Sequence, residues 1–566
     1  RRRGLHLAGY LSYECGYLLE PKLKKLLTSR TDSKTVLPLA WFGAYASPFV
    51  FDHASGNFLG PAPPHAALAT IPERFAADVK LEISSHEYAK KIDAIKRYIE
   101  SGDTYQVNFT DSVTVSNPHD PAAAFAVLSA SQPVAYSALL HVADQHILSL
   151  SPELFFRIRD GRLTTRPMKG TIPRGLDLEE DDQQAMRLQA DEKNRSEHIM
   201  IVDLLRNDLG RICRMGSVQV EDLLSIERYR TLLQMTSTIS GELNPGLSFG
   251  AIIRAIFPSG SITGAPKLRT MQIIRELERQ LRGVYTGAIG HITPAGDVTF
   301  NVAIRTLVLR DGIATMGVGA GIVADSHPAS EYRECQLKTE FLTRPVRQFQ
   351  LIETMLFDGH GLTFFPLHLD RLTSSAAYFD FTCDRDAIEA QLRDLEASLP
   401  SGRCYRVRLL LDATGAISLT HTEFTPDAAP LRIRISPHRT QSGDPLLRHK
   451  TTLRELYEQE YAQARADGFD EVLFLNERDE LTEGAISTLF IVEGDHLWTP
   501  PLSAGVLPGV LRRHILASRA EARQGKLTMS DLCKARAVYL GNSLRGMRPV
   551  SQVYLLDGTQ LEFAAR

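Results

Sequence analysis

The chain has 566 residues, of which 43% are hydrophobic and 23% charged, and its formal net charge at pH 7 is −3. Roughly two to four domains are expected at this length, and a near-neutral chain has no basic field to recruit nucleic acid or anionic lipid. No apolar run approaches the roughly 20 residues that span a bilayer, the N-terminal stretch is too polar for a signal peptide, and the six cysteines lack metal-ligand spacing. These features predict a cytoplasmic enzyme with reduced thiols that binds neither membranes nor nucleic acid.

Residues 1–60 carry short aromatic-rich segments that suit strands. The Pro/Ala-rich stretch 60–73 is typical of a linker or covering loop. From Ser85, apolar residues recur at helical spacing up to a stop at Gly102, after which the chain is expected to enter a strand.

A helix over 184–205 and strands within 285–323 are predicted next. The pattern restarts at 350–372, which reads as a hairpin leading into a helix. We therefore place the main boundary near residue 346. The predicted division is a partial N-terminal part at 1–75, a first domain at 76–345 and a second at 346–566.

Two glycine-rich stretches resemble nucleotide loops only superficially. In "FPSGSITGAPK" (257–267) the spacing of a phosphate loop fails and Pro266 would intrude. In "GVGAGIVAD" (317–325) the glycines miss the dinucleotide spacing. Both instead indicate close backbone approach to another anionic ligand.

The stretch "TTRPMKGTIPRG" (164–175) holds a lysine, Lys169, in an unusual setting. Pro167 and Pro173 exclude a helix, and Gly170 permits backbone conformations that other residues resist. From these residues alone, Lys169 is either ordinary surface charge or an amine held against a reacting molecule.

Seven motifs in chain order resemble the chorismate-binding family, which includes anthranilate, isochorismate and aminodeoxychorismate synthases. They are "SPELFF" (151–156), "RPMKGTIPRG" (166–175), "SEHIMIVDLLRNDLGRI" (196–212), "FPSGSITGAPKLRTMQIIRELE" (257–278), "RGVYTGAIG" (282–290), "FNVAIRT" (300–306) and "GVGAGIVADSHPASEYRECQLK" (317–338). The resemblance implies an α+β domain in which two packed antiparallel sheets with helices enclose chorismate.

The resemblance also implies a metal and a substrate site. Chorismate is a dianion, so its pocket must supply a cation, a metal or convergent N–H donors. The family's pattern places Mg²⁺ ligands at Glu197 and Glu334, with Glu331 one helical turn from Glu334. Without that context each would be read as a solvated helix glutamate. The implied substrate contacts are Gly170, Thr171, Tyr285, Arg305 and the backbone of Gly319, Ala320 and Gly321.

Lys169 resembles the lysine of aminodeoxychorismate synthase component I, where anthranilate synthases usually carry alanine. The resemblance implies that Lys169 attacks C2 of chorismate as a neutral amine, with Glu153 as general acid and base. Gln234 stands where anthranilate synthases have a histidine that assists pyruvate loss, which fits an enzyme that keeps the enolpyruvyl group. No glutaminase signature is visible, so a separate glutamine amidotransferase subunit is expected to supply ammonia, with free ammonia as the fallback.

The second half resembles the fold-type IV pyridoxal-phosphate family, which includes aminodeoxychorismate lyase, branched-chain aminotransferases and D-amino acid aminotransferases. The matching motifs are "HLDRL" (368–372), "RHKTTLRELY" (448–457), "DEVLFLNERDELTEGAISTLFIV" (470–492), "GVLPGVLRR" (505–513) and "LGNSLRGMRPV" (540–550). The resemblance implies a two-lobed α/β domain with the cofactor between its lobes, and a possible homodimer through this half.

Residue roles follow from the same resemblance. Lys450 would bind pyridoxal 5′-phosphate covalently, and Glu483 would face the pyridinium nitrogen. Phosphate and ring contacts are implied at Arg371, Ser487, Thr488, Val510, Leu511 and Ser543, although Thr488 stands where the family more often has Asn. Arg408 is a candidate for the substrate carboxylate.

Together the resemblances predict a bifunctional enzyme that makes 4-aminobenzoate for folate synthesis from chorismate and ammonia through 4-amino-4-deoxychorismate. One alternative is an anthranilate synthase component I joined to a branched-chain-type or D-amino acid aminotransferase, because the second-half motifs alone separate lyase from aminotransferase weakly. The other is a non-catalytic scaffold whose second half has lost its cofactor.

Overall fold

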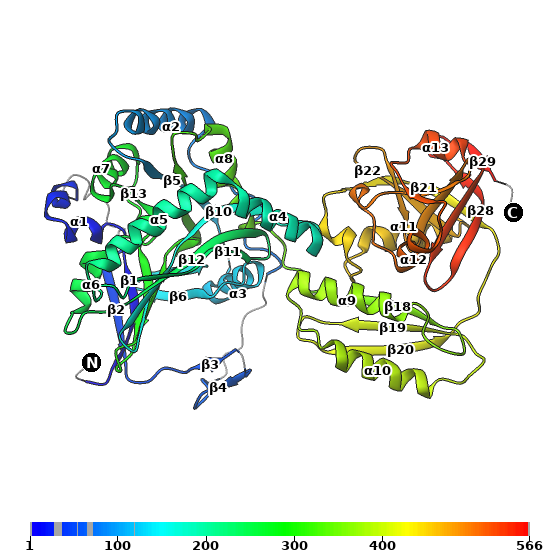
Figure 1. Ribbon diagram of the computed structural model, residues 1–566, viewed down its shortest axis with the longest axis horizontal. Helices are drawn as coiled ribbons and strands as arrows, with labels where there is room; N and C mark the ends of the chain where they lie inside the picture. Colours follow the sequence, from blue (N-terminus) through cyan, green and yellow to red (C-terminus); the bar gives the residue numbers. More distant parts are fainter. Residues whose placement is uncertain (1–2, 28–36, 54, 65–71, 118, 564–566) are drawn as a thin grey trace. The chain divides into compact units, whose positions relative to one another are not determined.

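The structure is a computed structural model that describes residues 3–27, 37–53, 55–64, 72–117 and 119–563. The chain forms two compact units (Figure 1). The first contains Arg1–Pro173 and Ala185–Arg347, and the second contains Arg174–Gln184 and Gln348–Arg566. The predicted covering loop at 60–73 lies largely outside the described residues. No helix in the described ranges is both long and apolar enough to cross a bilayer, and the six cysteines are free thiols.

The first unit is built on two antiparallel sheets, as the resemblance implied. The larger sheet runs in the order β10-β12-β9-β8-β15-β14-β1-β2, with β11 on the far side of β12. Its strands are β1 (His6–Leu11), β2 (Ala40–Tyr45), β8 (Leu154–Arg159), β9 (Arg162–Arg166), β10 (Met168–Pro173), β11 (Gln219–Arg228), β12 (Leu232–Glu242), β14 (Ala288–Ile292) and β15 (Val298–Val302). The aromatic segments near the N-terminus therefore form strands only in part: β1 and β2 belong to this sheet, whereas Cys15–Leu19 is helix α1.

The smaller sheet runs β13-β5-β17-β16-β7-β6. Its strands are β5 (Gln106–Ser116), β6 (Tyr136–Val142), β7 (Gln145–Ser151), β13 (Gly264–Ala265), β16 (Thr306–Arg310) and β17 (Ile313–Ile322), and a separate pair is β3 (Phe51–Asp52) with β4 (Asn57–Phe58). The strands predicted within 285–323 are confirmed as β14 to β17. Because side chains alternate along a strand, Val318 and Ala320 enter the core while Gly317, Gly319 and Gly321 leave the other face of β17 bare.

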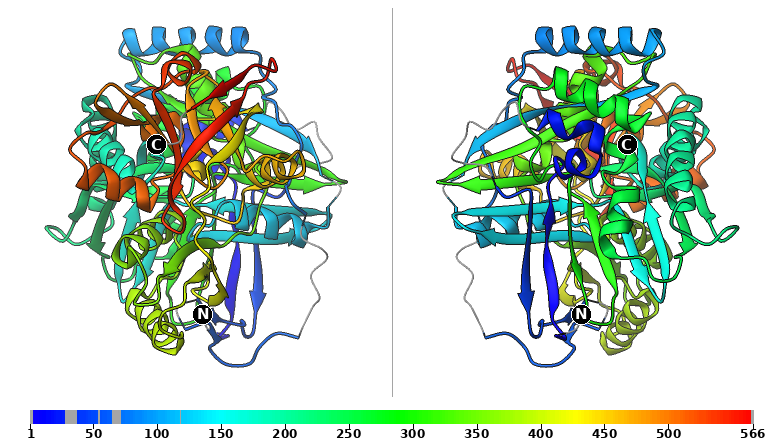
Figure 2. Two further views of the ribbon diagram at one scale, coloured as in Figure 1. Left: turned by 90° about the vertical axis from the view of Figure 1, so that its right-hand side faces the viewer. Right: turned by 90° about the vertical axis from the view of Figure 1, so that its left-hand side faces the viewer.

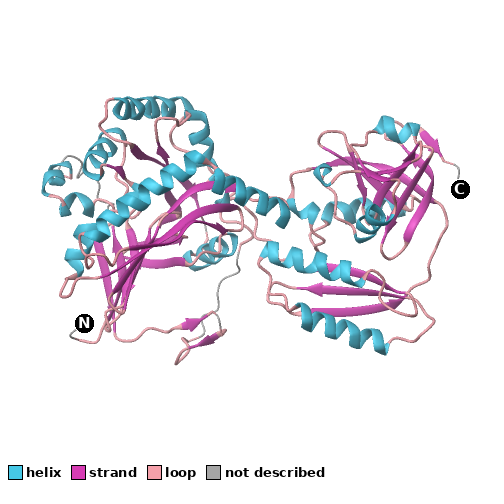
Figure 3. Cartoon of the chain, in the orientation of Figure 1, coloured by secondary structure: helices cyan, strands magenta, loops and turns pink. Residues whose placement is uncertain are grey.

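Helices lie outside the strands of this unit (Figure 3). They are α1 (Cys15–Leu19), η1 (Pro21–Leu26), α2 (Ser85–Glu100), α3 (Pro121–Ser131), α5 (Glu192–Gly210), α6 (Phe249–Ile256), η2 (Gly260–Ile262), α7 (Lys267–Leu277), α8 (Pro328–Leu337) and η3 (Glu340–Leu342). Helices α2 and α8 pack against each other and against β17 (Figure 2). Tyr88 of α2 meets Phe109 of β5 with ring centroids 5.5 Å apart, and both belong to the main hydrophobic core.

The predicted helix that ends at Gly102 is confirmed, and its N-cap is Ser84, whose side chain accepts from Glu87 N. The single helix predicted over 184–205 is wrong. The chain instead forms α4 (Leu178–Ala190) and α5, which are separated at Asp191. The Asp191 side chain accepts from Asn194 N and caps a new helix, a local contact that competes with helix continuation.

One part of the second unit is a small sheet of β18 (Leu351–Phe357), β19 (Tyr405–Leu411) and β20 (Ile417–Glu423) with helices α9 (Phe365–Phe379) and α10 (Arg385–Ser398) (Figures 1 and 3). The hairpin predicted before α9 is present only as a tight turn, in which Asp358 N donates to Gly361 O and Thr363 N donates to Leu356 O. The residues after β18 make only an isolated bridge, Phe357 to Leu362. The pairing partner of β18 is β19, much later in the chain.

The other part is a larger sheet that closes on itself. Its order is β23-β22-β21-β28-β27-β24, and a further pairing of β23 with β24 completes the ring. The elements here are β21 (Leu431–Thr440), η4 (Pro445–Arg448), α11 (Glu455–Ala466), β22 (Glu471–Asn476), β23 (Leu481–Gly484), β24 (Thr488–Glu493), β25 (His496–Thr499), η5 (Leu502–Ala504), α12 (Val510–Ser518), β26 (Ala522–Gln524), α13 (Met529–Lys534), β27 (Ala537–Asn542), β28 (Gly546–Tyr554) and β29 (Gln560–Glu562). Leucine and isoleucine side chains of these strands form a separate core.

Candidate functional site

A pocket of about 340 Å³ in the first unit is lined from both sheets and from helices α5 and α8. It brings together nearly all the predicted site residues of this half. These are Glu153, Lys169, Gly170, Thr171, Glu197, Tyr285, Arg305, Gly319, Gly321, Glu331 and Glu334, together with the discriminating residue Gln234. Ala320 points its side chain into the core instead, so only its backbone faces the pocket side.

Lys169 reaches this pocket because β10 is irregular beside it. The pairing of β10 with β12 shifts register between Lys169 and Thr171, and the residue between them, Gly170, has φ +76°. That left-handed conformation strongly favours glycine. The Lys169 Nζ lies over Gly321, where an added Cβ would come within 2.6 Å of it. Burial lowers the pKa of Lys169, so part of its amine can be neutral.

Glu153 is a buried carboxyl group at the start of β8. Ser261 Oγ, from η2, donates to Glu153 Oε1 at 2.6 Å. Burial raises the pKa of Glu153 to about 7, although the Ser261 hydrogen bond and the charge of Lys169 oppose the shift. A carboxyl group with this pKa can donate and accept a proton near neutrality. Ser261 was not singled out from the sequence, although it lies inside the glycine-rich stretch 257–267.

Glu197 on α5 and the pair Glu331 and Glu334 on α8 face the same pocket. Burial raises the pKa of Glu197 and Glu331, and the charge of Glu334 adds to both shifts. Glu334 also pairs with Lys338, whose Nζ lies 2.7 Å from Glu334 Oε1 and donates to Gly319 O. The charge of Lys338 instead lowers the pKa of Glu334.

Three carboxylates that line one pocket match the donor chemistry of a hard divalent cation. Within the described residues, however, no group of three acidic, histidine or cysteine side chains is arranged to hold a metal alone. A Mg²⁺ here would need water or the substrate to complete its ligands.

Arg305 lines this pocket with a buried guanidinium group that lacks one hydrogen-bond partner. Its φ is +48°, a strained backbone for a residue other than glycine, and its Nη1 is buried without a hydrogen-bond partner. Burial lowers the pKa of Arg305 to about 10, so the guanidinium stays charged at neutral pH. Such a group can bind an entering anion, and a carboxylate matches its fork.

In the second unit, Lys450 lies in the irregular stretch between η4 and α11, not at a helix end. Burial lowers the pKa of Lys450 to about 7, and the positive charges of Arg454 and Arg371 add to the effect. Glu483 is buried, accepts from Leu507 N at 3.1 Å and from Tyr457 Oη at 3.3 Å, and burial raises its pKa to about 7.

Arg371 is held by residues that the sequence did not single out. Its guanidinium donates twice to Glu353, at 2.6 and 2.8 Å, and His368 Nδ1 lies 2.5 Å from the same carboxylate. Breaking a buried pair of this kind costs about 3–5 kcal/mol. The arrangement therefore fixes both side chains, and it leaves His368 Nε2 buried without a partner.

These surroundings fit pyridoxal phosphate on three grounds. The first turn of α12 at Val510 and Leu511 has no side-chain cap, so its N–H groups can take a phosphate. Thr488 Oγ1 lies 2.9 Å from where a Cβ of Gly509 would be. The buried Lys450 amine supplies a further donor, and His368 Nε2, which has no partner, is free to accept a hydrogen bond because Nδ1 of the same ring donates to Glu353. Thr488 pairs directly with Glu483 where β23 meets β24.

For three other predicted residues, the contacts do not point to the proposed cofactor site. Ser487 donates to Glu471 at 3.0 Å, so its hydroxyl is already committed. Ser543 donates to Thr354 O at 3.5 Å. Arg408 is exposed on β19, with Arg406 on the same face. Their roles stay predictions.

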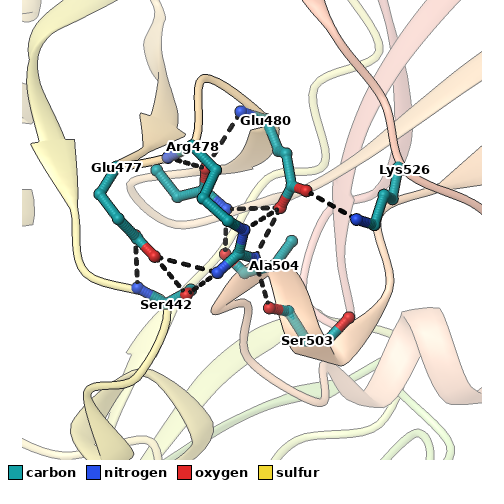
Figure 4. Close-up of polar contacts among 8 residues, drawn as sticks. Ser442, Glu477, Arg478, Glu480, Ser503, Ala504 and Lys526 are labelled. Carbon is teal, nitrogen blue, oxygen red and sulfur yellow. Dashed lines mark hydrogen bonds and ion pairs between the residues drawn. The ribbon is translucent and has the colours of Figure 1, made fainter.

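A polar cluster around Arg478 joins four segments of the second unit (Figure 4). The Arg478 side chain hydrogen-bonds Glu477, Glu480, Ser442 and the carbonyl of Ser503, and Lys526 pairs with Glu480. In the chain, Ser442 comes shortly before Lys450, Glu480 shortly before Glu483, and Ser503 shortly before α12. The cluster therefore ties together segments that are close in sequence to the candidate cofactor-binding residues.

The segment Arg174–Gln184, with the start of α4, folds into the second unit, which no sequence pattern indicated. Arg448 pairs with Asp177 and Glu180, and His449 Nε2 lies 3.1 Å from Leu176 O. Both contacts involve the residues directly before Lys450.

Comparison with known proteins gives two family matches. Residues 1–344 match the family described as chorismate binding enzyme, and residues 350–553 match amino-transferase class IV. An aminodeoxychorismate synthase component 1 from Klebsiella aerogenes is 37% identical over 337 residues, which cover 58% of this chain and 74% of that one. An aminodeoxychorismate synthase from Streptomyces pristinaespiralis is 43% identical over 274 residues, 48% of this chain and 38% of that one.

A solved structure is also similar to the first half. The crystal structure of anthranilate synthase component I from Streptococcus pneumoniae aligns with a TM-score of 0.54 and 30% identity, over 60% of this chain and 81% of that one. Of the Streptomyces pristinaespiralis relative, this chain spans 38%, which is much less than two thirds of that protein's length.

Proposed function

Because the chain belongs to the chorismate-binding enzyme family and continues into an amino-transferase class IV domain, we propose that it converts chorismate and ammonia to 4-amino-4-deoxychorismate, and this product to 4-aminobenzoate and pyruvate. The product would serve folate synthesis. The observation that carries the proposal is the amine of Lys169 over Gly321, in one pocket with Glu153.

In the first reaction, the neutral Lys169 amine forms a bond to C2 of chorismate while the ring double bond shifts and the C4–O bond breaks. Glu153, protonated in part near neutral pH, gives the departing hydroxyl its proton, so water leaves. Ammonia then forms the C4–N bond, the double bond shifts back and the bond to Lys169 breaks. The proton that ammonia loses goes to Glu153. No atom is oxidised or reduced.

Two groups would hold the substrate during this exchange. Arg305, with its unpaired Nη1, would bind one carboxylate. A Mg²⁺ held by Glu197 and Glu334, with Glu331 beside them, would bind the other. A separate glutamine amidotransferase subunit would supply the ammonia, which is consistent with relatives whose names designate them as one component of a synthase.

Removing a metal ligand gives a test of this assignment. We expect Glu197→Gln and Glu334→Gln each to raise the Mg²⁺ concentration for half-maximal activity by at least about tenfold, with the KM for chorismate rising in parallel. Glu334→Gln also frees Lys338, so Glu197→Gln, which removes no ion pair of its own, is the cleaner variant. The matched control is the exposed Glu100→Gln on α2. A wild-type Mg²⁺ response in both ligand variants would contradict the assignment.

In the second half, Lys450 and Glu483 would hold pyridoxal phosphate, with Arg371, Thr488 and the first N–H groups of α12 around it. When bound, the cofactor supplies an electron sink next to the substrate amine. Lys450, whose pKa is about 7, would take the proton from C4 of the substrate. The C3–O bond would then break as the electron pair of the former C4–H bond completes the aromatic ring, and the released enolpyruvate would take up a proton to become pyruvate.

Product analysis tests the proposed function as a whole. The full chain is incubated with chorismate, ammonium chloride and Mg²⁺, with and without added pyridoxal phosphate, and the products are separated by chromatography. We expect 4-aminobenzoate and pyruvate with the cofactor, and 4-amino-4-deoxychorismate without it. Anthranilate as the product would instead support the synthase to which the solved Streptococcus structure belongs. No conversion of chorismate would overturn the proposal.

A further inference from the structure

A second cavity, of about 180 Å³, lies beside the Lys169 pocket in the first unit. Its rim is exposed and includes Glu82, Arg279 and Gln280, whereas Arg282 and Tyr285 in its wall are buried. Its volume is several times the roughly 30 Å³ that one water occupies in the liquid. The cavity therefore opens at the surface and has room for a few small molecules.

The two cavities meet at Tyr285 and Gly317, which line both of them. A Cβ on Gly317 would lie 2.2 Å from Cδ1 of Tyr285, so the tyrosine ring lies directly on the glycine backbone. Since Gly317 adds no side chain, the ring of Tyr285 packs directly on backbone at the boundary between the two cavities.

A row of polar side chains runs along β5 past this boundary. Gln106, Asn108, Thr110 and Ser112 are alternate residues and so share one face of the strand. The register pairs Asn108 with Gly321, Thr110 with Gly319 and Ser112 with Gly317. Asn108 lines the Lys169 pocket, and Thr110 and Ser112 line the second cavity. The row thus joins the two cavities over the bare glycine face of β17.

The inner end of the row has unmet hydrogen-bonding capacity beside the reacting amine. Gln106 is 1% exposed, and neither its Nε2 nor its Oε1 has a hydrogen-bond partner. Leaving such a buried group unpaired costs about 1–3 kcal/mol. A Cβ on Gly321 would lie 2.5 Å from Gln106 Nε2 and 2.6 Å from Lys169 Nζ, so the amide and the amine flank the same glycine.

We propose that the second cavity is the inlet through which ammonia enters the Lys169 pocket, with the ring of Tyr285 as the partition. The inference rests on the proposed amination. Ammonia is small enough to pass one displaced ring, and it can exchange hydrogen bonds with the hydroxyl and amide groups of the β5 row. A narrow inlet also delivers ammonia without opening the reacting centre to bulk water, which would compete as the nucleophile.

The test fills the inlet without touching the Lys169 pocket. Thr315→Phe narrows the cavity from β17, and Ser112→Leu narrows it from β5. Ile313→Phe is the matched control, since Ile313 is on the same face of β17, is 50% exposed and lies outside the cavity lining. Each full-length variant is assayed with ammonium chloride at saturating chorismate and Mg²⁺, and the KM for chorismate and the Tm are measured in parallel.

We expect Thr315→Phe to raise the apparent KM for ammonium about tenfold, equivalent to about 1.4 kcal/mol. Ser112→Leu should act in the same direction, and both should leave the KM for chorismate unchanged. If Thr315→Phe fails to fold, the KM for ammonium of the Ser112→Leu variant provides the test. Folded variants with a wild-type KM for ammonium, or with the KM for chorismate raised equally, overturn the inlet while the amination stands. A wild-type protein that makes no 4-amino-4-deoxychorismate from ammonium overturns the proposed function and the inlet together.

Discussion

Replacing Lys169 by alanine should abolish the amination of chorismate while chorismate still binds. Lys169 is the amine that the bulge at Gly170 brings over Gly321, and its lowered pKa makes a neutral nucleophile available. Loss of a covalent nucleophile lowers kcat by roughly 10⁴-fold or more. The substrate contacts proposed for Arg305 and the metal do not depend on this side chain. We therefore expect kcat to collapse while the Kd of chorismate, measured in the presence of Mg²⁺, changes little.

The Lys169→Arg variant tests whether Lys169 acts as a nucleophile or only as a positive charge. Arginine keeps the positive charge but is not deprotonated in proteins, so it cannot attack as a neutral amine. It should be as inactive as Lys169→Ala. The control is Lys90→Ala, which removes an exposed lysine from α2. If Lys169→Ala makes 4-amino-4-deoxychorismate at the wild-type rate, or if Lys169→Arg restores activity, Lys169 does not attack the substrate.

Most residues of the first pocket could be predicted from the sequence because they lie in contiguous motifs. Lys169, Gly170 and Thr171 are neighbours on one strand, and the glycines of β17 alternate as one face requires. What it missed were contacts between segments far apart in the chain. Ser261 reaches Glu153 across more than one hundred residues, a distance that no local pattern encodes.

In the second unit, the sequence predicted the residues that we propose to face the cofactor and missed the residues that hold them in place. "HLDRL" pointed to Arg371 on helix α9, but Glu353, which orients it, belongs to strand β18. The segment Arg174–Gln184 is a sharper case, because it follows β10 in the chain yet folds with residues beyond 347. Hydrophobic periodicity reports which face of an element is buried, not which distant element buries it.

The break between α4 and α5 and the short hairpin after β18 share one cause. In both places a local polar or turn contact outweighs a pattern that could continue. Asp191 caps a new helix although apolar spacing continues beyond it. After β18, the Asp358 side chain accepts from the backbone N–H groups of His360 and Gly361, which satisfies the turn, and the pairing ends at a single bridge.

Replacing Lys450 by alanine should stop the second reaction and spare the first. The two lysines lie in units with separate hydrophobic cores, so loss of one amine does not perturb the other pocket. We expect chorismate consumption at the wild-type rate with ammonium chloride supplied directly. 4-Amino-4-deoxychorismate should accumulate instead of 4-aminobenzoate, and the ratio of the two by chromatography is the measurement. Lys534→Ala, at an exposed lysine of the same unit, is the control and should give the wild-type ratio.

Mixing Lys169→Ala with Lys450→Ala tests directly whether the two reactions take place in separate units. Lys169→Ala retains Lys450, and Lys450→Ala retains Lys169, so neither alone should form 4-aminobenzoate from chorismate. Together they should form it, because 4-amino-4-deoxychorismate released by one protein can diffuse to the second unit of the other. Formation should show a lag that shortens as the concentration of the Lys169→Ala partner increases. If folded Lys450→Ala no longer consumes chorismate, the two reactions share a site and the division into two independent halves is wrong.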